Sequence, residues 1–128
     1  MIVVDTSALI AIALDEADAE RCMHALHSVR PVLISAATVT ETLIVAHGRE
    51  CMGPVQALLD GFGLVVEPVT DTRARAAAAA YRRYGKQYHP AELNYGDSFS
   101  YALAREFDCP LLFIGNDFRQ TDVTPALT

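Results

Sequence analysis

The 128-residue sequence has no hydrophobic run long enough to cross a membrane. Its apolar segment at residues 8–14 is far shorter than the roughly 20 residues that a membrane-spanning helix needs. The first residues also lack the basic lead and the cleavage site of a secretory signal peptide. These absences predict a cytoplasmic protein that does not associate with a membrane.

Cysteine is scarce as well. Cys22, Cys51 and Cys109 are an odd number of thiols, and no two of them have CxxC spacing. This pattern argues against a zinc site or a disulfide framework and favours reduced, mostly buried thiols, as in a cytoplasm.

Basic residues are outnumbered, since 10 Lys and Arg stand against 16 Asp and Glu for a net charge of −6. This balance argues against a general nucleic-acid binder. Half of the basic residues, however, fall within residues 73–86, in a segment that we expect to be mostly helical. The candidates for RNA binding in this segment are Arg75, Arg82, Arg83 and Lys86. They can contact phosphates, dock an acidic partner or simply face solvent, and the sequence leaves these three roles open.

Short apolar runs alternate with helical segments along the chain. The expected strands are residues 2–5, 32–34, 64–66 and 111–113. The expected helices are residues 8–14, 17–29, 36–47, 54–59, 70–84 and 97–107. The alternation predicts a three-layer α/β fold, with a central parallel sheet of four or five strands flanked by helices. With no repeats and no linker, residues 1–128 are expected to form a single domain.

Four acidic residues lie where parallel strands end or the neighbouring helices begin: Asp5, Glu41, Asp97 and Asp117. Functional groups of open α/β sheets gather beyond the carboxyl ends of the strands, so we expect these side chains at one edge. Carboxylates that are forced together repel one another, and such clusters usually hold a cation. Oxygen ligands favour Mg²⁺ or Mn²⁺, the ions of phosphoryl-transfer chemistry.

Each acid also has an ordinary structural explanation. Asp5 can cap the helix that follows it, although Thr6 and Ser7 are expected to do so and to leave Asp5 available for a site. Glu41 can be an ordinary helix-surface residue, Asp97 a helix N-terminal residue and Asp117 a turn residue. The joint placement, rather than any single acid, therefore predicts the metal site.

Four segments together resemble a known family. They are Met1-Ile2-Val3-Val4-Asp5-Thr6-Ser7-Ala8, Ile34-Ser35 followed by Glu41, residues 93–104, and residues 110–118 with 121–123. In this order and at these separations, the chain resembles PIN-domain ribonucleases, in particular the VapC-type toxins of bacterial toxin–antitoxin (VapBC) pairs. The resemblance covers nearly the whole length.

The resemblance implies site residues. The family's acidic metal site matches Asp5, Glu41, Asp97 and Asp117, and its polar position beside the first acid matches Thr6 or Ser7. One position departs from the pattern, because many relatives carry the last acid where this chain has Gly115. The fourth role then passes to Asp117, and Asn116 can share it.

The resemblance also implies a function: a Mg²⁺- or Mn²⁺-dependent endoribonuclease toxin that hydrolyses tRNA or rRNA and inhibits translation and growth. The implied products are a 5′-phosphate and a 3′-hydroxyl, and the implied partners are the RNA, a second copy in a homodimer and a cognate VapB-type antitoxin. The alternative is a catalytically silent PIN fold that binds RNA or protein. A receiver-like phosphoacceptor fits poorly, because the only lysine, Lys86, lies in the wrong segment. A haloacid-dehalogenase-like phosphatase fits poorly too, because no second aspartate follows Asp5 by two residues.

Overall fold

The computed structural model describes residues 1–127. Its elements, in chain order, are β1 (Ile2–Val4), α1 (Thr6–Ala13), α2 (Ala19–Ser28), β2 (Val32–Ser35), α3 (Ala36–Gly48), α4 (Met52–Gly61), β3 (Val65–Glu67), α5 (Asp71–Tyr84), α6 (Tyr95–Glu106), β4 (Leu111–Leu112) and the 3-10 helix η1 (Phe118–Gln120). Within this part of the chain, no helix combines the length and the hydrophobicity that crossing a bilayer requires.

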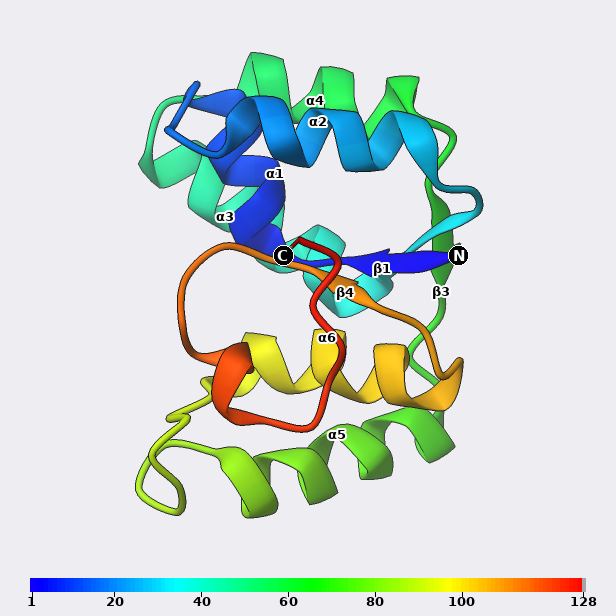
Figure 1. Cartoon of the computed structure of the whole chain (residues 1–128), viewed down its shortest axis with the longest axis vertical. Helices are drawn as coiled ribbons and strands as arrows, with labels where there is room; N and C mark the ends of the chain where they lie inside the picture. The colour runs from blue at the N-terminus through cyan, green and yellow to red at the C-terminus, as the bar shows by residue number, and fades with distance from the viewer. Residues whose placement is uncertain (128) are drawn as a thin grey trace.

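The four strands form one parallel sheet in the order β3-β2-β1-β4. Val3 of the central strand β1 pairs with Leu33 on one side and Leu111 on the other. Figure 1 shows the sheet between two helical layers, with α1, α2 and α4 on one side and α5 and α6 on the other. The predicted three-layer α/β fold is confirmed.

Two apolar cores cover the two faces of the sheet. Side chains alternate along a strand, so Val3 joins the core beneath α6, whereas Ile2 and Val4 join the core that includes Leu9 of α1 and Leu26 of α2. A sheet that is buried on both faces needs continuous apolar strands, and the short runs of the sequence meet that need. The edge strand β3 is the exception, because Val65 and Val66 are exposed.

Helix α5 is rotated about its axis from the orientation that hydrophobic spacing suggests. A helical stripe through Ala74, Ala77, Ala78 and Tyr81 would face the core, but the buried residues are Ala77, Ala80 and Tyr84. Residues 76–80 are all alanine, so side-chain size carries no directional information there. The Tyr84 ring, which packs edge-on against Tyr101 of α6, marks the face that turns inward.

Candidate active site

Asp5 is the last residue before α1 and is nearly buried, at 2% exposure. Its Oδ2 accepts hydrogen bonds from the Ser7 backbone N–H at 3.1 Å and from the Ser7 hydroxyl at 2.8 Å. Asp5 itself therefore caps α1, and the expectation that Thr6 and Ser7 would do so is wrong. One residue, Asp5, separates β1 from α1, so it alone occupies the N-cap position.

The second oxygen of Asp5 is held from another helix. The Ser100 hydroxyl of α6 donates to Asp5 Oδ1 at 2.6 Å. Thr38 Oγ1 of α3 lies 3.2 Å from Ser100 Oγ, and both Thr38 and Ser100 are fully buried. The direction of the first carboxylate is thus fixed by contacts from α1 and α6, with α3 behind them.

Glu41, on α3, is held by a similar set of hydroxyls. Thr6 Oγ1 donates to Glu41 Oε1 at 2.6 Å and lies 2.9 Å from Thr42 Oγ1. Gly96 at the start of α6 lies against the same carboxylate, and any Cβ at position 96 would overlap it. A side chain at position 96 would displace the Glu41 carboxyl group from this position, so glycine keeps the carboxyl group where it lies.

Asp97 occupies the third position of α6 and completes a capping box with Asn94. Its backbone N–H donates to Asn94 Oδ1 at 2.8 Å, and the Asn94 backbone N–H donates to Asp97 Oδ2 at 3.0 Å. The ordinary explanation for this aspartate, a helix start, is therefore correct. It does not exclude a site, because the capping box also fixes where the carboxyl group lies.

These three carboxyl groups interact electrostatically. Burial raises the pKa of Asp97 to about 7, and the charge on Asp5 adds to the rise, followed by those on Glu41 and Asp117. Burial also raises the pKa of Glu41, with a smaller contribution from Asp5 and an opposing one from the Thr6 hydrogen bond. The charge on Asp5 therefore makes ionisation of Asp97 and Glu41 less favourable, which is the electrostatic setting of a cation site.

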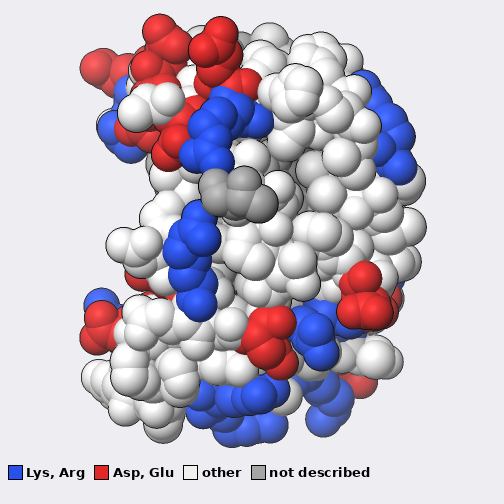
Figure 2. All heavy atoms as spheres, viewed as in Figure 1, with Lys and Arg blue, Asp and Glu red and all other residues white. Residues whose placement is uncertain are grey.

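Asp5, Glu41 and Asp97 line one open cleft of about 290 Å³, together with Glu16, Arg49 and Asn94 among others. The space-filling view is hollowed on its left side, where Figure 1 places the carboxyl end of the sheet and the start of α6 (Figure 2). Asp117 and Asn116 are exposed on the loop after β4 and do not line this cleft. The charge of Asp117 still acts on Asp97, so Asp117 belongs to the same edge, and its role as fourth acid stays a prediction.

The donor set fits a hard divalent cation, since it consists of carboxylate oxygens whose mutual repulsion a cation would relieve. In residues 1–127, however, no three His, Cys, Asp or Glu side chains lie close enough together to form a metal-binding group. The carboxylates share the cleft without converging on one point, and the four-acid ligand set remains a prediction.

Three comparisons with known proteins, by family model, by sequence and by structure, point to the same family. Residues 2–123 match the model of the PIN domain. Two curated relatives from Mycobacterium tuberculosis are "Ribonuclease VapC42", 44% identical over 98% of this chain and 99% of the relative, and "Ribonuclease VapC30", 45% identical over 94% and 95%. The chain belongs to the PIN-domain family and, within it, to the VapC ribonucleases. The solved structure of M. tuberculosis VapC20, a "Sarcin-Ricin loop cleaving toxin", has the same fold, with a TM-score of 0.75, 22% identity and coverage of 98% of this chain and 100% of that one.

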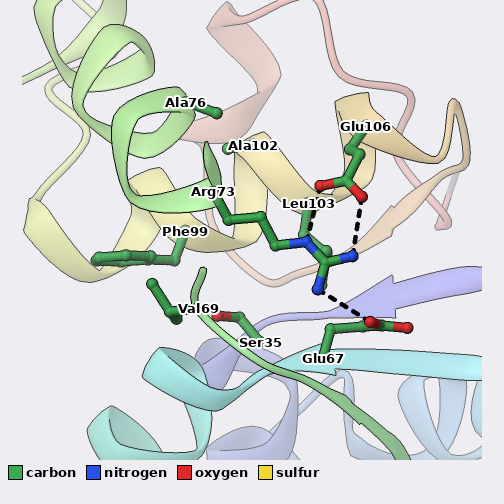
Figure 3. Close-up of a pocket in the computed structure, with 9 residues that line it drawn as sticks. All are labelled: Ser35, Glu67, Val69, Arg73, Ala76, Phe99, Ala102, Leu103 and Glu106. Carbon is green, nitrogen blue, oxygen red and sulfur yellow. Dashed lines mark hydrogen bonds and ion pairs between the residues drawn. The ribbon is translucent and has the colours of Figure 1, made fainter. Parts of the chain in front are cut away.

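The basic segment of this VapC-family chain does not line the acidic cleft. Arg73 binds Glu106 and Glu67 at 2.9–3.0 Å, as Figure 3 shows, and Arg75 pairs with Asp71 at 3.0 Å. The RNA-binding candidates, none of which lines the cleft, are Arg75, Arg82, Arg83 and Lys86. They lie on or just after α5, on the side of α6 that faces away from the sheet, where Figure 2 shows basic side chains gathered along the lower edge. Their contact with RNA stays a prediction.

Sequence reasoning missed several residues that shape the site, among them Gly96, Ser100 and Arg49. A signal existed for Ser100, because it lies three residues after Asp97 and therefore on the same face of the helix. Gly96 in the first turn of a helix was a weaker signal, since glycine is a poor helix former. Nothing in the sequence indicated that Arg49 faces the acids.

Proposed function

We propose that this chain is a divalent-metal-dependent endoribonuclease, the toxin of a VapBC pair, which hydrolyses phosphodiester bonds of tRNA or rRNA in the cytoplasm. The observation that carries the proposal is that Asp5 at the β1–α1 junction, Glu41 of α3 and Asp97 of α6 line one open cleft. The names of the relatives support the reaction. The similarity to VapC20, a toxin that cleaves the sarcin-ricin loop, supports an rRNA or another structured RNA as the substrate.

The chain's own residues have distinct roles in this proposal. Mg²⁺ or Mn²⁺, when bound, supplies positive charge beside the phosphate and activates water for attack. Asp5 and Asp97 are assigned to hold the cation, because hydrogen bonds from Ser7, Ser100 and Asn94 fix their orientation. Glu41, which Thr6 holds by one oxygen, is assigned to orient the attacking water.

Cleavage of tRNA and of an rRNA fragment by the purified protein tests this function. We expect cleavage in Mn²⁺ or Mg²⁺, products with a 5′-phosphate and a 3′-hydroxyl, loss of activity in EDTA, and its return when the ion is added back. An equal rate in EDTA would contradict the proposal. The absence of both cleavage and calorimetric heat on Mn²⁺ titration would favour the catalytically silent PIN fold. A DNA oligonucleotide with the sequence of the rRNA fragment is the substrate control.

We also propose a homodimer, supported by exposed apolar side chains on three neighbouring elements. Ile44 of α3 is 67% exposed, Val66 of β3 is 54% exposed, and Tyr95 at the start of α6 is 76% exposed. Helix α3 contacts both β3 and α6, and the Tyr95 ring packs on Phe99, which lies beside Val69 in Figure 3. Large apolar groups exposed on neighbouring elements of a small protein indicate a protein interface.

Sedimentation equilibrium measures the association directly. At micromolar concentration we expect a mass of twice the 13.9 kDa of the chain, and Ile44→Asp is expected to shift the equilibrium toward monomer. A wild-type protein that stays monomeric at about 100 µM would contradict the dimer, since the dissociation constant of a stable dimer lies well below that concentration.

A cognate VapB-type antitoxin is the proposed partner that blocks the site. One solved structure with this fold supports it, a "Toxin-antitoxin complex from Klebsiella pneumoniae" (TM-score 0.71, 19% identity, 98% of each chain). The structure of FitAB bound to a DNA fragment has the same fold (TM-score 0.62, 20% identity, 98% of this chain and 93% of that chain). Helices α1 and α3, which contact each other and carry Thr6 and Glu41, are the proposed walls of its docking groove.

A further inference from the structure

The candidate active site is strongly acidic for an enzyme whose substrate is a polyanion. Four carboxyl groups line the cleft, those of Asp5, Glu16, Glu41 and Asp97. One divalent cation offsets two negative charges at most, and every RNA phosphate brings another. Within residues 1–127, Arg49 is the only Lys or Arg among the residues that line this cleft.

Arg49 has a fixed backbone and a loosely held side chain. It is the C-cap residue of α3, and its backbone N–H donates to Val45 O at 2.9 Å. Its guanidinium lies 3.8 Å from Glu16 Oε2, and the two side chains are 52% and 44% exposed. A charge-assisted hydrogen bond is normally about 2.7–2.9 Å long, so this contact is a weak ion pair rather than a locked one.

Other arginines that form ion pairs lie elsewhere or are held more closely. Arg73 is bound by two carboxylates, as Figure 3 shows. Arg83 and Arg105 lie near Asp122, on the groove between α5 and α6. Arg49 therefore combines a position on the acidic cleft with a guanidinium that can change partner at little cost.

We propose that Arg49 binds an RNA phosphate adjacent to the bond that is cut, and that Glu16 holds Arg49 at the edge of the cleft until RNA displaces the ion pair. The inference rests on the proposed ribonuclease function and names the residue that brings the substrate to that site. The planar guanidinium donates two parallel hydrogen bonds to one phosphate, which lysine does not match. The main phosphate contact near the acids then comes from the end of α3 and not from the basic segment of α5.

The experiment separates binding from cleavage. RNA affinity is measured by fluorescence anisotropy in Mg²⁺ over a salt series, with every variant built on Asp5→Asn so that the RNA stays intact. Arg49→Ala is expected to weaken binding about 5–10-fold and to reduce the slope of log affinity against log salt by about 0.7, the value for one phosphate contact on a single strand. Arg49→Lys should keep the slope and lose part of the affinity. Glu16→Gln should tighten binding about 2–3-fold, because it removes the competing carboxylate.

Arg21→Ala is the matched control. Arg21 of α2 is 51% exposed and pairs with Asp18 at the N-cap of that helix, so its loss changes the net charge equally without touching the cleft. Unchanged affinity in Arg49→Ala, or an equal loss in Arg49→Ala and Arg21→Ala, would overturn the role of Arg49.

The wild-type protein shows which proposal has failed. If it cuts RNA but Arg49→Ala binds normally, only the role of Arg49 is lost. If the wild type neither binds nor cuts RNA, the proposed function is lost with it. Thermal unfolding confirms that each variant is folded, and Glu16→Gln tests the role of the ion pair independently should Arg49→Ala be unstable.

Discussion

Replacement of Asp5 by asparagine is expected to reduce RNA cleavage by at least about 10³-fold, because it removes a negatively charged ligand from the position that two helices orient. Asparagine has nearly the same shape, so the cleft keeps its form while the affinity for a divalent cation falls. Single-turnover cleavage at saturating Mn²⁺ measures the chemical step. A rate within about tenfold of wild type would remove Asp5 from the catalytic site.

The same variant should remain folded, and the hydrogen bonds show why. The amide oxygen of the new side chain can accept from Ser7 and keep the cap of α1, while its NH₂ can donate to Ser100 Oγ. The Ser100 hydroxyl can then turn toward Thr38 Oγ1, which lies 3.2 Å away. Loss of one negative charge also relieves the repulsion that acts on Asp97 and Glu41. Asp60→Asn on the exposed surface of α4 is the control, and equal loss of activity there would show that the effect is not specific.

Manganese affinity is expected to fall steeply below pH 7. The pKa of Asp97 is raised to about 7 in the metal-free protein, so at lower pH this carboxyl group holds a proton that a metal ion must displace. Affinity should fall about 15-fold between pH 7.0 and 5.5, because about half of the Asp97 carboxyl groups are already protonated at pH 7.0. At still lower pH the fall approaches roughly tenfold per pH unit. Calorimetric titrations in buffers of different ionisation enthalpy measure both the affinity and the proton released. Binding that is independent of pH over this range would contradict the assignment of Asp97 as a ligand.

The stability of the metal-free protein should change in the opposite sense. The folded pKa of Asp97 lies above its ordinary value of 3.8, so the folded state binds more protons than the unfolded state between pH 4 and 7. This contribution to stability is present at the acidic end of that window and is lost as the pH rises through 7. Asp122 and Glu106, whose pKa values are lowered, act with the opposite sign, but their window lies below about pH 4.5.

Thermal unfolding at pH 5.5 and 7.5 in EDTA tests this sign. The wild type should melt several degrees higher at pH 5.5 than at pH 7.5. The corresponding difference in the free energy of unfolding is on the order of 1–2 kcal/mol, because solvent screens the charge of the partly exposed Asp97. Asp97→Asn should lose most of that difference and melt at nearly the same temperature at both values. An equal pH dependence in the two proteins would assign the effect to other groups.

Features that depend on short-range pattern were predictable. The apolar runs marked the strands, and the alternation with helices indicated a parallel sheet. The connection of parallel strands then placed Asp5, Glu41 and Asp97 at one edge, because all carboxyl ends of such a sheet point the same way. The sequence motifs identified the family, because their spacings keep the acidic residues at that edge of the sheet.

Features that depend on contacts between distant segments were not predictable. The Ser100 hydroxyl meets Asp5 across 95 positions, and Thr6 meets Glu41 across 35. Gly96 contacts Glu41 only because α6 packs against α3. The orientation of α5 depended on which way one tyrosine points, since five consecutive alanines look alike from every side.

By itself, then, the sequence determined the fold class, the family and the edge that holds the acids, because periodicity and strand direction are local properties of a chain. Only the tertiary structure decided which hydroxyls orient each carboxylate, that Asp5 caps its own helix, and that Arg49 rather than a residue of α5 faces the cleft. Those outcomes depend on how closely helices approach and how far they rotate. Packing of the whole core sets both quantities, and no single segment encodes them.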